Sequence, residues 1–205
     1  MTVSSNGRKP VGILAIQGDF ALHARILDRI GAPWKLVKHA SQLDEIGGLI
    51  MPGGESTTML KFFRAEGFGE AIKRFAAAGK PVFGTCAGTI LLAKEVTHPK
   101  QEHLGLIDIT VERNAYGRQI DSSVREGRVS GLDAGREPQE RPVEMVFIRA
   151  PIIRRVGEGV RVLGRAGDLP VLVEQQNVLA ATFHPELTED ETIHRYFLGK
   201  LADTS

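Results

Sequence analysis

The chain is organised around the stretch Lys80-Pro81-Val82-Phe83-Gly84-Thr85-Cys86-Ala87-Gly88-Thr89-Ile90-Leu91-Leu92-Ala93. This stretch predicts a short apolar strand at 81–83, a turn at 84–88 and an apolar helix at 89–94. Cys86, the one cysteine of the chain, stands at the centre of the turn with a glycine two residues to either side. A sharp strand-to-helix turn needs small flanking residues and pushes its central side chain outward, as in a nucleophile elbow. The N-terminus of the helix would also favour the thiolate form of Cys86.

A lone cysteine is more often a small buried hydrophobic residue than a nucleophile. The two glycines and the strand-turn-helix context favour catalysis, but a nucleophile of this kind also needs a base. The sequence must therefore supply a histidine at the same edge of the fold.

The composition sets the class of protein. With 205 residues, the chain can form one well-buried domain, which we place at residues 10–203, after a disordered tail at residues 1–9. The net charge of +1 gives no basic field for nucleic acid, and no apolar run is long enough for a membrane span. A single cysteine forms no intrachain disulfide, and the polar start lacks a signal peptide, so we expect a cytoplasmic protein.

Strands and helices alternate in the first half of the chain. Continuous apolar runs predict buried strands, and periodic apolar faces predict helices, the first with Asp19 as its cap. This order favours parallel strands with helices on both faces of the sheet. The expected strands are 11–16, 34–37, 48–51 and 81–83, and the expected helices are 19–30, 40–46, 57–66 and 69–78.

The second half has closely spaced strand patterns, which favour antiparallel or mixed pairing. Residues 123–142, rich in Gly, Arg, Glu and Gln, are expected to form a long exposed loop, and residues 189–201 a final helix with an apolar stripe. The expected strands are 106–112, 143–148, 160–164, 171–174 and 178–183.

Three loops are expected to meet at one edge of the sheet. Gln17, the segment 52–56 and Cys86 each follow directly on a predicted strand. Ligands of parallel α/β sheets bind at the carboxyl ends of the strands, so these loops should line one site.

A base for the nucleophile is supplied by His184-Pro185-Glu186, which follows the predicted strand 178–183. Pro185 should keep the backbone extended, so that His184 and Glu186 point the same way. Glu186 could then orient the imidazole while its other nitrogen takes the thiol proton. The alternative is a histidine that satisfies a loop and a glutamate that opens the last helix.

The loop Pro52-Gly53-Gly54-Glu55-Ser56 could offer backbone N–H groups to an oxyanion. The alternative is an ordinary Gly-Gly turn capped by Ser56. The loop lacks the lysine of a phosphate-binding loop, so nucleotide binding is not expected. The remaining histidines show no metal-ligand spacing and are interpreted as surface or core residues, so no metal site is expected; they are His23, His39, His98, His103 and His194.

The elbow together with His184-Pro185-Glu186 resembles the class I glutamine amidotransferases, which use a Cys-His-Glu triad. Further stretches resemble, more closely, the glutaminase subunits of pyridoxal 5'-phosphate synthase, and the similarity runs from about residue 11 to residue 201. These stretches are Leu14-Ala15-Ile16-Gln17-Gly18, Pro52-Gly53-Gly54-Glu55-Ser56-Thr57-Thr58, Glu112-Arg113-Asn114, Tyr116-Gly117-Arg118-Gln119, Phe147-Ile148-Arg149-Ala150-Pro151 and Phe183-His184-Pro185-Glu186-Leu187-Thr188.

The resemblance implies a fold and a reaction. The fold would be a three-layer α/β/α, flavodoxin-like domain with a mixed, mostly parallel sheet. Cys86 would attack the side-chain amide of L-glutamine to give a thioester and ammonia, with His184 moving the proton and Glu186 orienting the imidazole. No cofactor is implied.

The resemblance also implies residue roles around the triad. The N–H groups of Gly54 and Ala87 would form the oxyanion hole, and Gln17 would help to switch it on at the rim where a partner docks. Guanidinium groups suit a carboxylate, as the substrate would carry. The residues implied to bind glutamine are Gly54, Glu55, Ser56, Arg113, Ile148 and Arg149.

The implied partner is a barrel-shaped synthase subunit, which would receive the ammonia for vitamin B6 synthesis. Two features depart from the usual pattern: Leu22 replaces a polar residue, and the segment 123–142 is long and charged. Neither touches the triad, but both bear on partner contacts.

Three alternatives remain open. The chain could be the glutaminase of another synthase, such as the imidazole-forming one, although the motifs at 112–119 and 147–151 argue against this. It could be a non-catalytic binding module, against which the intact triad argues. It could also be a cysteine hydrolase of peptides or γ-glutamyl chains, which would need a deep, extended groove.

Overall fold

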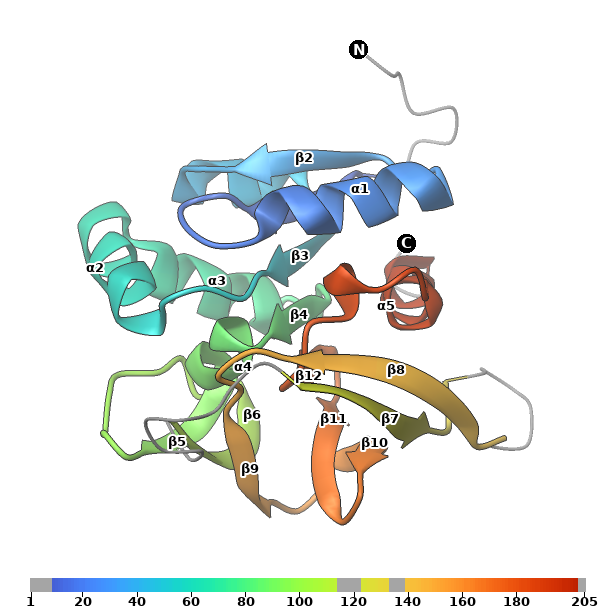
Figure 1. The fold of residues 1–205 in the computed structure, drawn as a ribbon. Coiled ribbons are helices and arrows are strands. Elements are labelled where there is room, and N and C mark those ends of the chain that lie inside the picture. Colours follow the sequence, from blue (N-terminus) through green and yellow to red (C-terminus); the bar gives the residue numbers. More distant parts are fainter. Residues whose placement is uncertain (1–8, 114–122, 133–138, 203–205) are drawn as a thin grey trace.

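The computed structural model describes residues 9–113, 123–132 and 139–202. Its centre is a nine-stranded sheet (Figure 1). In spatial order its strands are β2 (Trp34–Val37), β1 (Val11–Leu14), β3 (Gly48–Met51), β4 (Val82–Thr85), β12 (Val178–Ala181), β11 (Leu169–Gln175), β10 (Arg161–Ala166), β7 (Ser123–Val129) and β8 (Arg141–Phe147).

The two halves of this sheet differ in direction. From β2 to β12 the four neighbouring pairs are parallel, and from β12 to β8 the four pairs are antiparallel. Strands β1, β3, β4 and β12 are buried along their whole length, as expected for strands covered on both faces. The expected mixed sheet is confirmed, but the expectation that it is mostly parallel is wrong, because antiparallel pairs are as numerous as parallel ones.

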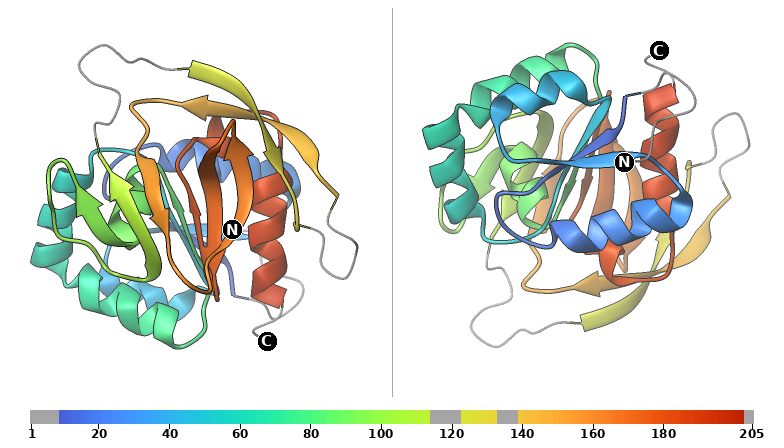
Figure 2. Two further views of the ribbon diagram at one scale, coloured as in Figure 1. Left: turned by 90° about the horizontal axis from the view of Figure 1, so that it is seen from below. Right: turned by 90° about the horizontal axis from the view of Figure 1, so that it is seen from above.

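Helices cover both faces of the sheet (Figure 2). On one face, α1 (Phe20–Ile30) and α5 (Thr192–Ala202) pack in one apolar cluster, which includes Leu27 and Phe197. On the other, α2 (Ser56–Glu66), α3 (Phe68–Ala77) and α4 (Ala87–Leu92) pack in a second cluster. The described residues also include two short 3-10 helices, η1 (Ala40–Glu45) and η3 (Pro185–Leu187). The expected three layers are therefore present.

A second sheet, which the sequence analysis did not predict, lies on the face of α4. It consists of β5 (Ala93–Thr97), β6 (Ile107–Glu112) and β9 (Ile152–Val156). The predicted helix 89–94 is thus wrong at its end, because α4 stops at Leu92 and the chain turns extended. Val96, Ile109 and Ile153 of this sheet pack into the same cluster as α4, so burial decides the change.

The expected loop at 123–142 is wrong at both ends. Residues 123–129 form β7, which pairs antiparallel with β8, from Ser123 opposite Phe147 to Val129 opposite Arg141. Val129, Val143 and Met145 are buried, while most of the charged side chains of β7 face solvent. Backbone pairing does not require apolar side chains, so a charged, Gly-containing segment can form a strand when a partner strand is present. Residues 133–138 lie outside the described residues.

Two helix starts also differ from expectation. Asp19 precedes α1 but makes no side-chain cap hydrogen bond. The last helix begins at Thr192 rather than residue 189, because Asp190 Oδ1 accepts a hydrogen bond from the Thr192 N–H at 2.7 Å and so caps it. Most of the expected tail at 1–9 lies outside the described residues. No described helix has the length and apolar character needed to cross a membrane.

Candidate active site

Cys86 lies at the turn between β4 and α4, at the carboxyl end of the parallel strands. Its backbone has φ 45° and ψ −99°, a conformation that non-glycine residues seldom adopt. The Cys86 N–H donates to the Ala181 carbonyl of β12 at 2.9 Å, which ties the turn to the neighbouring strand. A Cβ on Gly88 would lie 2.2 Å from the Met51 carbonyl oxygen. The strained turn predicted from the sequence is therefore present, and this glycine is required by close packing.

His184 and Glu186 leave the end of β12 beside this turn. The His184 N–H donates to the Val146 carbonyl at 2.8 Å, and its Nδ1 lies 2.7 Å from Glu186 Oε1. The predicted extended backbone is wrong, because Pro185 begins the 3-10 helix η3. Proline suits the first position of a helix, and the turn brings the carboxylate under the imidazole. Both side chains are buried.

The charges of these groups follow from their contacts. Burial alone would lower the pKa of His184, but hydrogen bonds and charge from Cys86 and Glu186 outweigh it and raise the pKa to about 10. Burial would raise the pKa of Glu186, but the electrostatic interaction with His23, together with the hydrogen bond and charge of His184, lowers it. The site therefore holds a protonated imidazole between the Cys86 sulfur and an ionised carboxylate.

A pocket of about 90 Å³ opens beside Cys86. The six residues expected to bind glutamine all line it, although they come from three separate segments of the chain. The Cys86 thiol donates a weak hydrogen bond to the Ile148 carbonyl at 3.9 Å. The residues that line the pocket are Gly54, Glu55, Ser56, Cys86, Ile90, Arg113, Ile148, Arg149 and Pro151.

Arg113 brings an unused donor to this pocket. Its side chain is 11% exposed, and one terminal nitrogen lies 3.8 Å from Glu55 Oε1. Among the residues that the structure describes, the buried Nε of Arg113 has no hydrogen-bond partner. A buried guanidinium N–H without a partner is costly, so a ligand acceptor would be favoured there.

Glu55 and Ser56 stand at the start of α2. The Glu55 carboxylate accepts hydrogen bonds from the Thr57 and Thr58 backbone N–H groups and so caps the helix. The Ser56 hydroxyl donates to Gln101 Oε1 at 3.0 Å. Gln101 was missed in the sequence, where it lies in a connection between strands without any motif.

Gln17 reaches this loop from the end of β1. Its Oε1 accepts a hydrogen bond from the Glu55 N–H at 2.7 Å, and the Asp19 N–H donates to the Gly53 carbonyl at 3.3 Å. Gly54 lies between these contacts with φ 153°. Ala87 follows Cys86 as the first residue of α4, where a backbone N–H has no acceptor within the helix. The three loops therefore meet at one edge, as predicted.

Two buried histidines, for which the sequence predicts no role, lie behind the triad. His23 Nε2 is 3.5 Å from Glu186 Oε2, and His23 Nδ1 is 2.9 Å from His194 Nε2. One signal was available: His23 lies three and four residues before Ile26 and Leu27, on the buried face of α1.

One group within the described part of the chain has the spacing of a metal site, namely Asp19, His184 and Glu186. His184 Nδ1 and Glu186 Oε1 already bind each other, and Asp19 is exposed. This donor set fits proton transfer, and we assign no metal to it. The motif at 116–119 lies outside the described residues.

Comparison with known proteins shows the family of this chain. A relative from Solibacter usitatus, "Pyridoxal 5'-phosphate synthase subunit PdxT", is 54% identical over 94% of this chain and 100% of its own. The protein of the same name from Thermus thermophilus is 51% identical over 93% of this chain and 97% of its own. A crystal structure of a glutamine amidotransferase has a TM-score of 0.85 and 48% identity, covering 94% of this chain and 98% of its own, which confirms the expected fold. The model of the SNO glutamine amidotransferase family matches residues 13–203, and the chain therefore belongs to that family.

Proposed function

We propose that this chain is the glutaminase subunit of a pyridoxal 5'-phosphate synthase and hydrolyses L-glutamine to L-glutamate and ammonia. The observation that carries the proposal is Cys86, in contact with His184, facing a pocket that Arg113 and Arg149 line. The names of the relatives at about half identity support the choice of synthase.

The first half of the reaction forms a thioester. The Cys86 sulfur, whose proton His184 Nε2 holds, attacks the side-chain amide carbon of glutamine, and the carbonyl oxygen becomes an oxyanion. His184 Nε2 is free for this chemistry because Nδ1 is bonded to Glu186. It gives its proton to the amide nitrogen as the C–N bond breaks, so ammonia leaves and the glutamyl thioester remains.

The second half returns the enzyme to its starting state. Neutral His184 takes a proton from water, and the hydroxide attacks the thioester carbon. The C–S bond breaks, glutamate leaves, and Cys86 again faces a protonated imidazole. Glu186 stays ionised throughout and stabilises the positive charge on the ring.

The backbone supplies the stabilisation of the oxyanion. The N–H groups of Gly54 and Ala87 would donate to the oxyanion. Gly54 lines the pocket together with Cys86, and Ala87 follows Cys86 as the first residue of α4. Gln17 holds the Glu55 N–H and so sets how the neighbouring Gly54 peptide lies. A partner that docks on this rim could change that peptide and thereby regulate turnover.

Charged groups in the pocket match the two ends of an amino acid. Arg113 and Arg149 would bind the substrate carboxylate, and Glu55 its ammonium group. Ser56 and Ile148 would line the remainder. The small volume argues against peptides or γ-glutamyl chains, which need an extended groove.

The ammonia would pass to a barrel-shaped synthase subunit for vitamin B6 synthesis, and the hydrolysis itself needs no cofactor. We place the reaction in the cytoplasm, where a free catalytic thiol stays reduced.

The test is ammonia release from glutamine, with and without a pyridoxal 5'-phosphate synthase subunit, using Cys86→Ala as the inactive control. A rise with the partner that Cys86→Ala lacks is the expected result. Release that ignores this partner would point to another amidotransferase, and no release in either condition would leave a non-catalytic binding module.

A further inference from the structure

His23 and His194 are fully buried, and the reaction described above uses neither. They come from different helices, α1 and α5, and meet directly behind Glu186. His23 Nε2 faces two oxygens, Glu186 Oε2 at 3.5 Å and Thr85 Oγ1 at 3.3 Å. Within the described chain, Glu186 Oε2 has no closer hydrogen-bond partner. The carboxylate oxygen that His184 leaves free is therefore opposite a ring nitrogen of His23.

Both rings are neutral at neutral pH. Burial lowers the pKa of His194 to about 3, and burial likewise lowers the pKa of His23 against the raising effect of Glu186. The other charged groups near the pair are His184, Asp19 and Arg29. A neutral imidazole carries a single N–H, so each ring must choose which nitrogen donates.

The contacts decide that choice. With its proton on Nδ1, His23 would donate to His194 Nε2, and the only N–H of His194 would sit on Nδ1, which has no partner among the described residues. Glu186 Oε2 would also lack a donor. With its proton on Nε2, His23 accepts from His194 Nε2–H and directs its own N–H at both Thr85 Oγ1 and Glu186 Oε2. Only the unprotonated Nδ1 of His194 then lacks a hydrogen-bond partner. This costs less free energy than leaving both a buried N–H and a carboxylate oxygen without partners.

We propose that His23 is a positioning residue that holds Glu186, and through it His184, and that His194 fixes the tautomer in which His23 does so. The distance of 3.5 Å is long for a hydrogen bond, and such contacts commonly shorten when substrate binds. The effect on glutamine turnover rests on the proposed function, whereas the effect on the Cys86 thiol does not.

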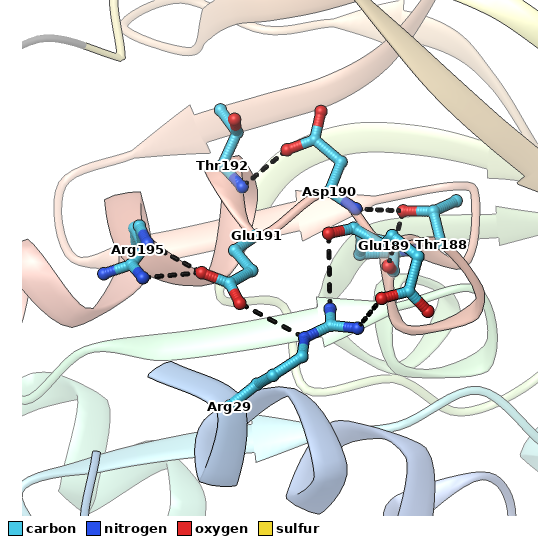
Figure 3. A network of polar contacts seen from close by, with 8 residues as sticks. Arg29, Thr188, Glu189, Asp190, Glu191, Thr192 and Arg195 are labelled. Carbon is cyan, nitrogen blue, oxygen red and sulfur yellow. Dashed lines mark hydrogen bonds and ion pairs between the residues drawn. The ribbon is translucent and has the colours of Figure 1, made fainter. Parts of the chain in front are cut away.

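An aromatic ring and a set of surface ion pairs help to fix the positions of His23 and His194. Phe83 of β4 meets both rings edge-on, at centroid distances of 6.4 Å and 5.9 Å. At the surface, Arg29 of α1 binds Glu189 and Glu191, and Arg195 of α5 also binds Glu191 (Figure 3). These contacts join the helix that carries His23 to the segment that follows Glu186.

Two substitutions separate hydrogen bonding from packing. His23→Gln can keep an N–H near the position of Nε2, whereas His23→Leu fills the space without a donor. His194→Leu removes the donor that fixes the tautomer. His103→Leu, at an exposed histidine away from the pocket, is the control.

The first readout is alkylation by iodoacetamide, because Cys86 is the only cysteine of the chain. We expect His23→Leu to slow the reaction at neutral pH and to move its pH profile upward, and His23→Gln to restore it. In the complex with the synthase subunit, kcat for glutamine should fall about 10–100-fold in His23→Leu, the size seen when outer hydrogen bonds to site groups are removed. KM should change little, because His23 does not line the pocket.

Either of two results would overturn the proposal. One is alkylation and kcat in His23→Leu within about two-fold of the wild type. The other is an equal loss in His23→Gln and His23→Leu at equal melting temperature. If the variants do not fold, the 15N spectrum of the wild type decides, since a proton on His23 Nδ1 contradicts the proposal. Failure of the proposed function alone would show as no glutamine turnover by the wild type, with the alkylation differences intact.

Discussion

His184 and Glu186 meet across a single 3-10 turn, with the imidazole Nδ1 2.7 Å from the carboxylate Oε1. The pair is set by the local backbone, because only Pro185 separates the two residues. Cys86 comes from a different strand and depends on the parallel pairing of β4 with β12 to reach the imidazole. Removing the thiol should therefore leave the pair in place, which allows the charge of His184 to be tested by itself.

Cys86→Ala should lower the pKa of His184 from about 10. Burial lowers this pKa, and the variant loses the opposing hydrogen bond and charge of Cys86 while keeping those of Glu186. In the wild type the ring should stay protonated as pH rises through neutrality, and in the variant it should lose its proton at lower pH. Titration by histidine NMR measures both. Glutamine hydrolysis should fall by roughly 10⁴-fold or more.

An unchanged His184 pKa in Cys86→Ala would mean that the thiol is not its partner. Retained turnover would remove Cys86 as the nucleophile. His103→Ala serves as the control, because its ring is exposed and lies outside the pocket.

Glu55→Ala should destabilise the protein by about 0.5–1 kcal/mol, the low range for an N-cap, because the side chain is 44% exposed. Burial raises the pKa of Glu55, but hydrogen bonds from Thr57 and Thr58 outweigh it and lower the pKa to about 2. Because folding lowers this pKa, the Glu55 carboxylate stabilises the protein fully at pH values above 4.5, its pKa in the unfolded chain. This stabilisation should be lost as pH falls toward 2. Urea unfolding at several pH values measures the difference.

Glu55→Gln is the matched comparison for this cap, since it keeps an acceptor but carries no charge. Its stability difference from the wild type should also shrink in acid. A difference that stays constant between neutral and acidic pH would show that the carboxylate charge does not contribute.

Arg149→Ala should raise KM for glutamine by roughly 10–100-fold, the value of one hydrogen bond to a charged group. Its stability should change by less than about 0.5 kcal/mol, because the side chain is exposed. Steady-state kinetics in the complex and thermal unfolding measure the two effects. Arg128→Ala, at a largely exposed arginine outside the pocket, should change neither by a comparable amount. An unaltered KM in Arg149→Ala would exclude this side chain from the substrate site.

Gln17→Ala should lower turnover in the complex more than it changes KM. The variant removes the acceptor of the Glu55 N–H and so frees the peptide beside Gly54, which the proposed oxyanion hole uses. The cost in stability should be about 1 kcal/mol, as for one hydrogen bond. Kinetics with and without the synthase subunit test this, and equal turnover by variant and wild type in the complex would contradict a role for Gln17.

Local patterns predicted much of the first half of the chain. Strands β2 and β3 have the predicted bounds, because short apolar runs between turn residues have few other ways to be buried. The turn at Cys86 was predicted because its glycines are needed by the turn itself. The predictions failed at β5, β7 and β9, whose side chains are mixed or charged and whose strand form depends on pairing with other strands of the folded chain.

The same division holds for the site. The sequence by itself determined the nucleophile turn and the Gly-Gly loop, because each depends on neighbouring residues. It also identified His184 and Glu186, but not the 3-10 turn that brings them together. Only the tertiary structure decided that Arg113, Ile148 and Arg149 line one pocket with Cys86, and that His23 and His194 lie behind Glu186. These contacts join segments separated by many residues, and their distances depend on how strands pair and helices pack.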